Sequence, residues 1–327
     1  MATYNINGVK IGELADGENS FLVNNVSELL SAVDIAEYGQ TINIANGTYE
    51  IDSTLQIPYG VSVKMNQYAK IVASESFVGD YVLKYYGDGD FEYNTTNPIT
   101  GGEDELMGLL FSGGIIDAQG KAGCFSMGKG MHITIENMTF LNPKTAGLNV
   151  GNEGFCYETI VKNCYARTFV NGCEGNIGFC INAMDNHFVD CITQDVTTAF
   201  KDNQGSNRFT RCHIWGGRLG YPNSHPMLNN SIGFDLSSHN TLTDCYADTS
   251  AIGIKINGTN NVIIGANCFN NYSKYGLDNI VLVDLNGNGT KFIGCDMRTG
   301  GTPHYTLINN PNNKTYEAIA CIGFPNN

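Results

Sequence analysis

The sequence predicts an all-β solenoid, a stack of coils in which each coil pairs with the next. Two interleaved series of short β-type segments recur between residues 160 and 298, at spacings of 20 to 34 residues. No helical pattern of about 10–15 residues lies between these segments, which excludes repeated strand–helix–strand units. Repeats of this kind cannot bury their apolar side chains alone, so neighbouring coils stack into one continuous core.

The first series is marked by a cysteine after each short β-type run. Its members are Cys164, Cys191, Cys212, Cys245, Cys268 and Cys295, at spacings of 27, 21, 33, 23 and 27 residues. The chain has 11 cysteines, an odd number without C-x-x-C pairs, which is a poor disulfide framework and a poor zinc site. We therefore expect most thiols to be reduced and buried, in a ladder at an interior bend of the coils.

The second series is anchored by a small residue in the segments NIGFCIN, TTAFKDN, SIGFDLS and AIGIKIN. Its anchors are Gly178, Ala199, Gly233 and Gly253. After each anchor an inward apolar side chain is followed by an outward one, and the outward column is Cys180, Lys201, Asp235 and Lys255. Both series lengthen across residues 216–230, so we expect one coil to carry a long side loop there.

The N-terminal part predicts a short helix and the first strands. Asn25 is a suitable N-cap and Gly39 a suitable residue beyond the C-terminus, and the apolar side chains between them are Leu29, Leu30, Val33 and Ala36. Such a helix would cover the open end of the stack. We expect residues 1–50 to form the N-terminal segment with this capping helix and residues 51–327 the solenoid. The acidic stretch 86–105 predicts a surface loop.

Composition narrows the function classes. Acidic residues exceed Lys and Arg by 32 − 18 = 14, and the low cation count argues against nucleic acid as a partner. A hydrophobic content of 42% with 34 aromatic residues excludes a disordered chain. No apolar stretch approaches about 18 residues, so no membrane association is predicted. The first residues lack a secretory pattern, and the expected location is cytoplasmic or phage-associated, or extracellular after lysis or signal removal.

Two long segments resemble a known superfamily. NVSELLSAV…GQTINIANGTYEIDSTLQIPYGVSV is similar to the opening of right-handed parallel β-helix proteins of the pectin-lyase-like superfamily, and GGIIDAQGKAGCFSMGKGMHITIENMTFLNPKTAGLNV is similar to their next coils. The resemblance covers about residues 25–310 and implies a right-handed parallel β-helix with a short N-terminal capping helix. That superfamily includes polysaccharide lyases, glycoside hydrolases, phage tailspike depolymerases and glycan binders. Tailspike-like members are commonly trimers, so the resemblance also implies a homotrimer.

Two columns of outward side chains are candidates for the functional surface. Three residues after each cysteine of the first series stand Arg167, Gln194, Trp215, Asp248, Asn271 and Arg298. This column is polar and holds the only tryptophan, so we expect it where each coil leaves its third strand and turns. The outward column of the second series would flank the same turn, and together the two would line a shallow groove. The long loop with Arg218, Tyr221 and His225 would wall one side.

A groove of this kind suits a carbohydrate. Trp215, Tyr221 and Tyr272 would stack on sugar faces. The side chains expected to hold hydroxyl or carboxylate groups are Arg167, Lys201, Arg218, His225, Lys255 and Arg298. The candidate catalytic carboxylates for acid/base hydrolysis of a glycosidic bond are Asp195, Asp235 and Asp248. Asp195 and Asp248 stand two coils apart, roughly 9–10 Å at the backbone, which is nearer the inverting separation than the retaining one.

Several alternatives stay open from the sequence. Polygalacturonase signatures and the clustered Asp of a pectate-lyase calcium site are missing, so neither a metal nor a cofactor is predicted. A polysaccharide lyase, a phage-tail-like protein that binds glycan without cleaving it, and a structural stalk remain alternative functions. Asp195 and Asp248 could instead bond turn backbone, and the second column could be a surface charge ladder. His132 and His187 are interpreted as ordinary strand-edge residues.

Overall fold

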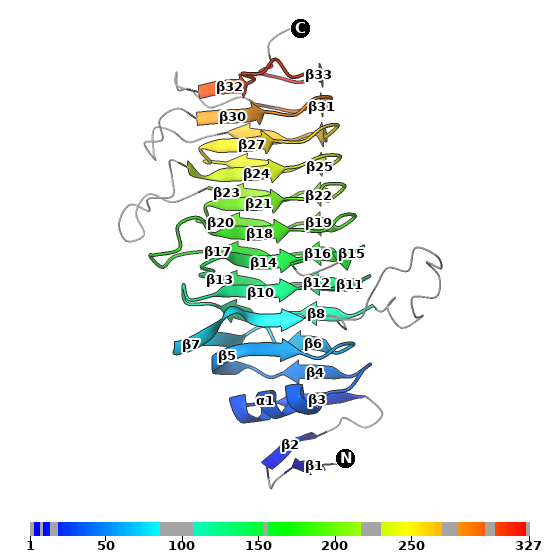
Figure 1. Ribbon diagram of the computed structural model, residues 1–327, viewed down its shortest axis with the longest axis vertical. Helices are drawn as coiled ribbons and strands as arrows, with labels where there is room; N and C mark the ends of the chain where they lie inside the picture. The colour runs from blue at the N-terminus through cyan, green and yellow to red at the C-terminus, as the bar shows by residue number, and fades with distance from the viewer. Residues whose placement is uncertain are drawn as a thin grey trace.

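The protein is a tall stack of parallel β-strand windings with one short helix beneath it (Figure 1). The computed structural model describes residues 3–6, 9–13, 19–85, 108–152, 156–216, 230–269, 280–297 and 305–324. The predicted sites Arg218, Tyr221, His225, Tyr272 and Arg298 lie outside these residues, as do the predicted loop 86–105 and nearly all of the long side loop. The β-solenoid predicted from the repeats is confirmed.

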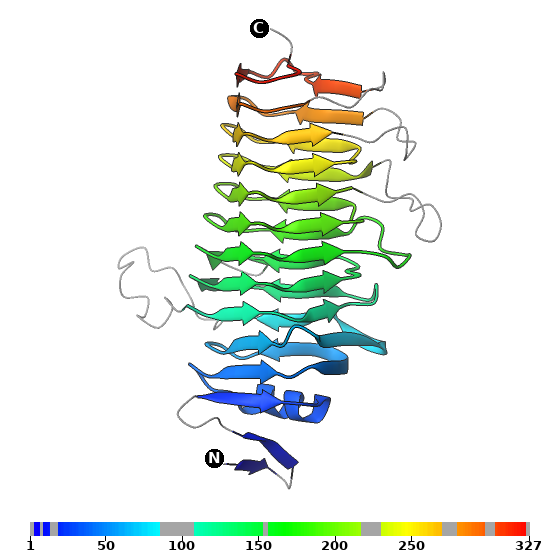
Figure 2. The ribbon, with the colours of Figure 1, turned by 180° about the vertical axis from the view of Figure 1, so that it is seen from behind.

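The coils build three walls, of which the first is a 12-stranded parallel sheet. Its strands are β3 (Ser20–Val23), β4 (Thr41–Ile44), β6 (Ser62–Met65), β8 (Leu110–Ser112), β12 (Thr134–Glu136), β16 (Ile160–Lys162), β19 (His187–Val189), β22 (Arg208–Thr210), β25 (Thr241–Thr243), β28 (Val262–Ile264), β31 (Thr290–Ile293) and β33 (Tyr316–Ile319). Figure 2 shows the stack from behind.

The second and third walls belong to one 17-stranded sheet, and the long strands β5 (Gly47–Ile57) and β7 (Ala69–Tyr85) run through both. The second wall continues with β9 (Ile115–Asp117), β13 (Thr139–Leu141), β17 (Tyr165–Arg167), β20 (Ile192–Gln194), β23 (His213–Trp215), β26 (Tyr246–Asp248) and β29 (Asn267–Phe269). The third wall continues with β10 (Gly123–Met127), β14 (Ala146–Val150), β18 (Ile177–Ile181), β21 (Thr198–Asp202), β24 (Ile232–Leu236), β27 (Ile252–Ile256), β30 (Ile280–Leu285) and β32 (Tyr305–Asn309).

Short additional pairs lie outside the three walls. Strands β1 (Thr3–Ile6) and β2 (Val9–Glu13) pair antiparallel, and β11 (Gly130–Met131) and β15 (Cys156–Tyr157) pair parallel. Within the described residues no helix is long and apolar enough to cross a membrane.

The N-terminal end is covered by α1 (Val26–Ile35). The Asn25 side chain accepts a hydrogen bond from the Glu28 backbone N–H at 3.0 Å, and the Glu28 carboxylate accepts one from the Asn24 backbone N–H at 2.8 Å. This capping pattern confirms the predicted helix start. Leu29 is fully buried, but Leu30, another of the apolar residues of the predicted helix, is 50% exposed. The apolar stripe is therefore narrower than the sequence suggested.

Like residues stack in the interior. The Phe179, Phe200 and Phe234 rings lie one above another on the third wall, with centroid separations of 4.9 and 5.2 Å. Across the core the rings of Phe188 and Phe209 from the first wall stack at 5.4 Å. All five side chains are almost completely buried. These stacks follow from the register, because each strand pairs with its equivalent one coil later.

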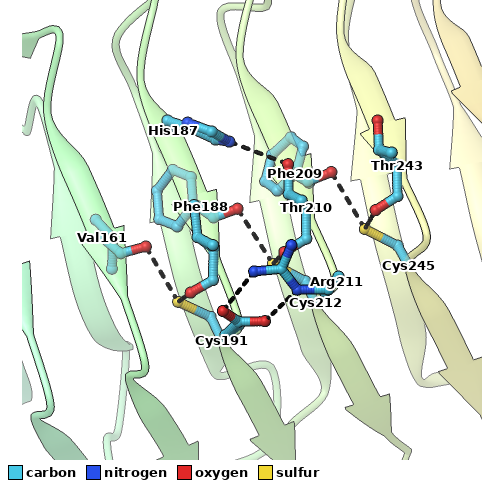
Figure 3. Close-up of polar contacts among 12 residues, drawn as sticks. Val161, His187, Phe188, Cys191, Phe209, Thr210, Arg211, Cys212, Thr243 and Cys245 are labelled. Carbon is cyan, nitrogen blue, oxygen red and sulfur yellow. Dashed lines mark hydrogen bonds and ion pairs between the residues drawn. The ribbon is translucent and has the colours of Figure 1, made fainter.

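A bend that we call the cysteine turn joins the first wall to the second. Cys191, Cys212 and Cys245 lie at equivalent positions, and each thiol donates to a carbonyl of the preceding coil at 3.3–3.5 Å (Figure 3). Burial raises the pKa of the Cys212 thiol. All 11 cysteines are free and all except Cys321 are buried, which confirms the predicted burial of most of the thiols.

The predicted ladder contains one error of alignment. Cys268 pairs with Ala247, not with Cys245, and therefore lies two residues further along its coil. Ala266 takes its place in the ladder, and Cys295 returns to it because Asp296 bridges to Asn267. The residue that continues the predicted polar column is thus Phe269. Asn271, which the sequence assigned to this place, lies outside the described residues.

The small anchors of the second series have a packing reason. A Cβ atom added to Gly178 would lie 2.7 Å from the Ala199 carbonyl oxygen and 2.7 Å from Cγ2 of Thr193, an inward residue of the second wall. Such distances are well inside van der Waals contact. The backbone of the third wall therefore lies directly against side chains of the second wall.

Candidate functional site

The outward side of the second wall from β17 to β29 carries two ladders of side chains, and we call it the second-wall face. The third residues of its strands align as Arg167, Gln194, Trp215, Asp248 and Phe269. The first residues align as Tyr165, Ile192, His213, Tyr246 and Asn267. The middle residues point into the core, because side chains alternate along a strand. The predicted outward position of the first column is therefore confirmed for Arg167 to Asp248.

Aromatic rings cover much of this face. The ring centroids of His213 and Tyr246 are 4.5 Å apart, and those of Tyr246 and Phe269 are 4.8 Å apart. All three rings and that of Trp215 are partly exposed. The Tyr165 hydroxyl donates to the Gln194 carbonyl oxygen at 2.6 Å, which fixes the amide. Partly exposed rings that keep a polar edge suit a ligand with both apolar faces and hydroxyl groups.

Asp248 is the only carboxylate among the described side chains of the second-wall face. Burial raises its pKa, although a hydrogen bond donated by the Thr249 hydroxyl and the nearby His213 ring act in the opposite direction. The pKa of His213 is lowered by burial, and the pKa of Tyr246 is raised to about 12 by burial and by the Asp248 charge. A carboxyl group that holds its proton more tightly than usual is suited to donate that proton to a leaving group.

His213 adds an unused polar atom to the same face. Its Nε2 is buried and has no hydrogen-bond partner within the described part of the chain. A buried ring nitrogen without a partner costs free energy, so such an atom is an attachment point for a ligand or for an ordered water.

Asp195 is not exposed in the groove where the sequence placed it. Asp195 is 2% exposed and its backbone φ is +56°. Its carboxylate lies 3.4 Å from Nε of Arg167. The chain turns at Asp195, directly after the outward Gln194, and this turn carries its side chain out of the strand alternation. Asp195 holds the Arg167 guanidinium, whose carbon also lies 5.8 Å from the centre of the Phe169 ring.

The outward column on the third wall lies on the other side of the same turn, as predicted. Lys201, Asp235 and Lys255 are in register, and Asp284 continues their column. Lys255 Nζ lies 4.0 Å from Oδ1 of Asp235, and the Asn257 amide donates to that oxygen at 2.5 Å. The column is therefore a ladder of alternating charge, with Asp235 held between a lysine and an amide.

A pocket of about 250 Å³ lies away from both columns, along the edge where each coil enters the first wall. Its lining residues are His132, Glu158, Thr159, Ile160, Asp185, Asn186, His187, Ser206 and Arg208. His132 and His187 were interpreted from the sequence as ordinary strand-edge residues, and this pocket was not predicted. One signal was available, since His187 and Arg208 occupy the same position in successive repeats. Within the described residues no group of three or more His, Cys, Asp or Glu could hold a metal ion.

No protein-family model and no curated protein matches the chain. Among solved structures, ORF18 of Geobacillus virus E2 matches with a TM-score of 0.68 and 17% identity, over 91% of this chain and 59% of that chain. The enzymatically active domain of bacteriophage CBA120 tailspike protein 4 matches with a TM-score of 0.60 and 13% identity, over 92% and 41%. An alginate lyase from a Paenibacillus species matches with a TM-score of 0.60 and 11% identity, over 89% and 99%.

These likenesses establish the fold. The chain is a parallel β-helix similar in fold to the tailspike domain and the alginate lyase, which confirms the fold that the resemblance implied. It spans about three fifths and two fifths, respectively, of the two phage proteins that it matches.

Proposed function

We propose that the protein is carbohydrate-active and hydrolyses a poly- or oligosaccharide bound along the second-wall face. One observation carries the proposal: a half-buried carboxyl of raised pKa, Asp248, lies within a run of partly exposed aromatic rings. The names of solved neighbours, an alginate lyase and an enzymatically active tailspike domain, support carbohydrate chemistry as the class.

The bound chain would run parallel to the long axis of the solenoid. Successive coils are about 4.8 Å apart, so the five strands from β17 to β29 offer roughly 19 Å of continuous surface, enough for several sugar units. Trp215 and Tyr246 would pack on sugar faces, while Gln194 and Arg167 would bond hydroxyl or carboxylate groups. Asp195 would act as a positioning residue that fixes Arg167.

Hydrolysis needs two carboxyl groups in different protonation states. Asp248 would donate its proton to the oxygen of the leaving sugar. Asp235, across the turn and paired with Lys255, would accept a proton from the attacking water. Asp195, predicted from the sequence as a third catalytic candidate, has no role as acid or base in this scheme because its side chain is only 3% exposed, against 13% for Asp235.

A polysaccharide lyase is the second candidate function. The observation that favours it is the pair of His213 and Tyr246, whose rings lie 4.5 Å apart beside Asp248. The lowered pKa of His213 keeps the imidazole neutral at pH 7, so it could remove a proton next to a sugar carboxylate. Tyr246 could then supply a proton to the leaving oxygen.

Product analysis distinguishes these functions. The protein is incubated with a panel of neutral and acidic polysaccharides, and both reducing ends and the ultraviolet absorbance of unsaturated sugar ends are followed. New reducing ends without absorbance support hydrolysis, and both together support elimination. Binding without product would leave glycan binding as the function.

Substitutions then test the site. Asp248→Asn and Asp235→Asn should each lower the hydrolysis rate by about a hundredfold or more. The matched control is Asp244→Asn, an exposed residue of the cysteine turn with φ of +52°, where asparagine fits equally well. Full hydrolytic activity in both Asp248→Asn and Asp235→Asn would refute the proposed site.

The assembly predictions remain separate proposals. A homotrimer is implied by the resemblance to tailspike-like proteins and is tested by light scattering of the purified chain. Association with a virion is a further proposal, supported by the phage origin of two solved neighbours.

A further inference from the structure

The pocket on the first-wall edge is built by four successive coils. Each of the strands β12, β16, β19 and β22 contributes lining residues, from the segment just before it or from its first position. At about 4.8 Å per coil these segments span roughly 14 Å. A pocket of about 250 Å³ is smaller than the sites of drug-sized ligands and suits one or two sugar rings.

One side of the pocket offers a cation and an apolar surface. Ile160, His187 and Arg208 stand above one another in register. Ile160 is 42% exposed, and Arg208 is exposed and has no ion-pair partner among the described residues. The His187 ring is held by a 3.0 Å hydrogen bond between its Nε2 and the Thr210 hydroxyl (Figure 3).

His187 is a neutral ring in this setting. Burial lowers its pKa, and the charges of Arg208 and Arg211 lower it further. At neutral pH the pocket therefore has one fixed cation on this side, the Arg208 guanidinium, beside an uncharged imidazole. A guanidinium binds carboxylates through two parallel hydrogen bonds.

The pocket lining also offers hydrogen-bond acceptors. Glu158 and Asp185 are exposed, lie at equivalent left-handed turn positions with φ of +53° and +60°, and line the pocket. Thr159 and Asn186, which are buried and also line the pocket, are joined by a 3.0 Å hydrogen bond from the Thr159 N–H to the Asn186 Oδ1. The two carboxylates would repel a simple anion but accept hydrogen bonds from hydroxyl groups.

We propose that this pocket is a second carbohydrate site, specific for a sugar unit that carries a carboxylate, such as a uronic acid. The sugar carboxylate pairs with Arg208, its hydroxyl groups donate to Glu158 and Asp185, and its apolar C–H face packs on Ile160. The site lies on a different wall from the second-wall face, so it anchors an acidic glycan without taking part in cleavage. The proposal is independent of the hydrolase assignment.

The test is a titration of the intact protein, with histidine side-chain resonances followed by NMR. The probes are a glucuronate-containing disaccharide, a neutral disaccharide and acetate at matched ionic strength. We expect saturable shifts of the His187 resonances with the acidic disaccharide. The neutral disaccharide and acetate should each bind at least about tenfold more weakly. The exposed His239, at the turn before β25, serves as an internal reference.

Two arginine variants form a matched pair. Both Arg208 and Arg211 lower the His187 pKa, but only Arg208 lines the pocket. Arg208→Gln should weaken binding of the acidic disaccharide by about tenfold or more, and Arg211→Gln should leave it nearly unchanged. Asp248→Asn, on the second-wall face, should leave binding of the acidic disaccharide in the pocket unchanged. This result is expected whether or not the protein hydrolyses a polysaccharide.

Three results would overturn the proposal. Absence of saturable His187 shifts would show that the pocket binds no such sugar. An equal loss in Arg208→Gln and Arg211→Gln would assign binding to overall charge. Equal affinity for the neutral disaccharide or for acetate would refute the acidic-sugar class.

Discussion

The cysteine turn and the turn between the second and third walls, which we call the outer turn, differ sharply in regularity. In four successive coils the cysteine turn consists of one left-handed residue and one cysteine, and the left-handed residues are Asn163, Asp190, Arg211 and Asp244. The outer turn takes three residues after β20 and after β26, but sixteen separate the end of β23 from the start of β24. The uniform turn maintains the stack, and the variable turn borders the proposed active face, as expected when function resides in loops on a rigid scaffold.

The largest effect should come from the regular interior. Phe200→Ala removes the middle ring of a buried stack and should lower the free energy of unfolding by about 3–5 kcal/mol. The measurement is urea unfolding at equilibrium. Leu30→Ala, at a half-exposed position of α1, is the control and should cost well under about 1 kcal/mol. Similar losses in both variants would contradict the assignment of the core.

The cysteine turn should respond less strongly. Cys212→Ala removes a buried thiol and should lower the free energy of unfolding by about 1–2 kcal/mol, because one heavy atom and one weak hydrogen bond are lost.

In the native protein a thiol reagent should modify Cys321 well before the ten buried cysteines, and mass spectrometry can count the modified thiols. Rapid labelling of Cys212 in the folded state would contradict the buried ladder.

At the border of the outer turn a smaller effect of opposite sign is expected. The folded state raises the pKa of Asp248, so it favours the protonated carboxyl. Stability is therefore lost as the pH rises from the ordinary Asp pKa, about 3.9, through the folded value, and the loss is complete at neutral pH. Asp248→Asn should raise the melting temperature at pH 7, and the gain should vanish near pH 3. A variant less stable than the parent at pH 7 would argue against a desolvated carboxyl.

The smallest effect should come from the surface of the cysteine turn. Arg211 donates two hydrogen bonds of 2.7 Å to the Asp190 carboxylate, but both side chains are exposed. Arg211→Gln should therefore cost about 1 kcal/mol or less, and high salt should reduce the difference. Thermal unfolding at low and high ionic strength measures it. A larger, salt-independent loss would assign Arg211 a packing role.

The sequence predicted the solenoid because residue types repeat where side chains stack. It placed Lys201, Asp235 and Lys255 in one column correctly, since alternation along a strand fixes the face of each residue. The misplacement of Cys268 has the same origin. A shift of two residues keeps a side chain inside the core, so residue type alone could not distinguish this position from that of Ala266.

The candidate site was less predictable than the fold. Asp195 follows an outward residue, but its left-handed backbone turns the chain and breaks the alternation on which the prediction depended. The raised pKa of Asp248 depends on burial by neighbouring coils, which no local pattern reports. The first-wall pocket was missed because the first repeat series was anchored on the cysteines that follow the first-wall strands, whereas the pocket lies where these strands begin.

The close backbone contact at Gly178 also fixes the frame from which the outer turn departs. Gly233 and Gly253 make the same approach to their neighbouring coils, where an added Cβ would lie 2.3 and 2.8 Å from a carbonyl oxygen. The third-wall strands that carry these glycines are thereby held close to the next coil. Connecting segments of different length can be exchanged between these fixed points without repacking the interior, so one scaffold can be fitted with new recognition loops.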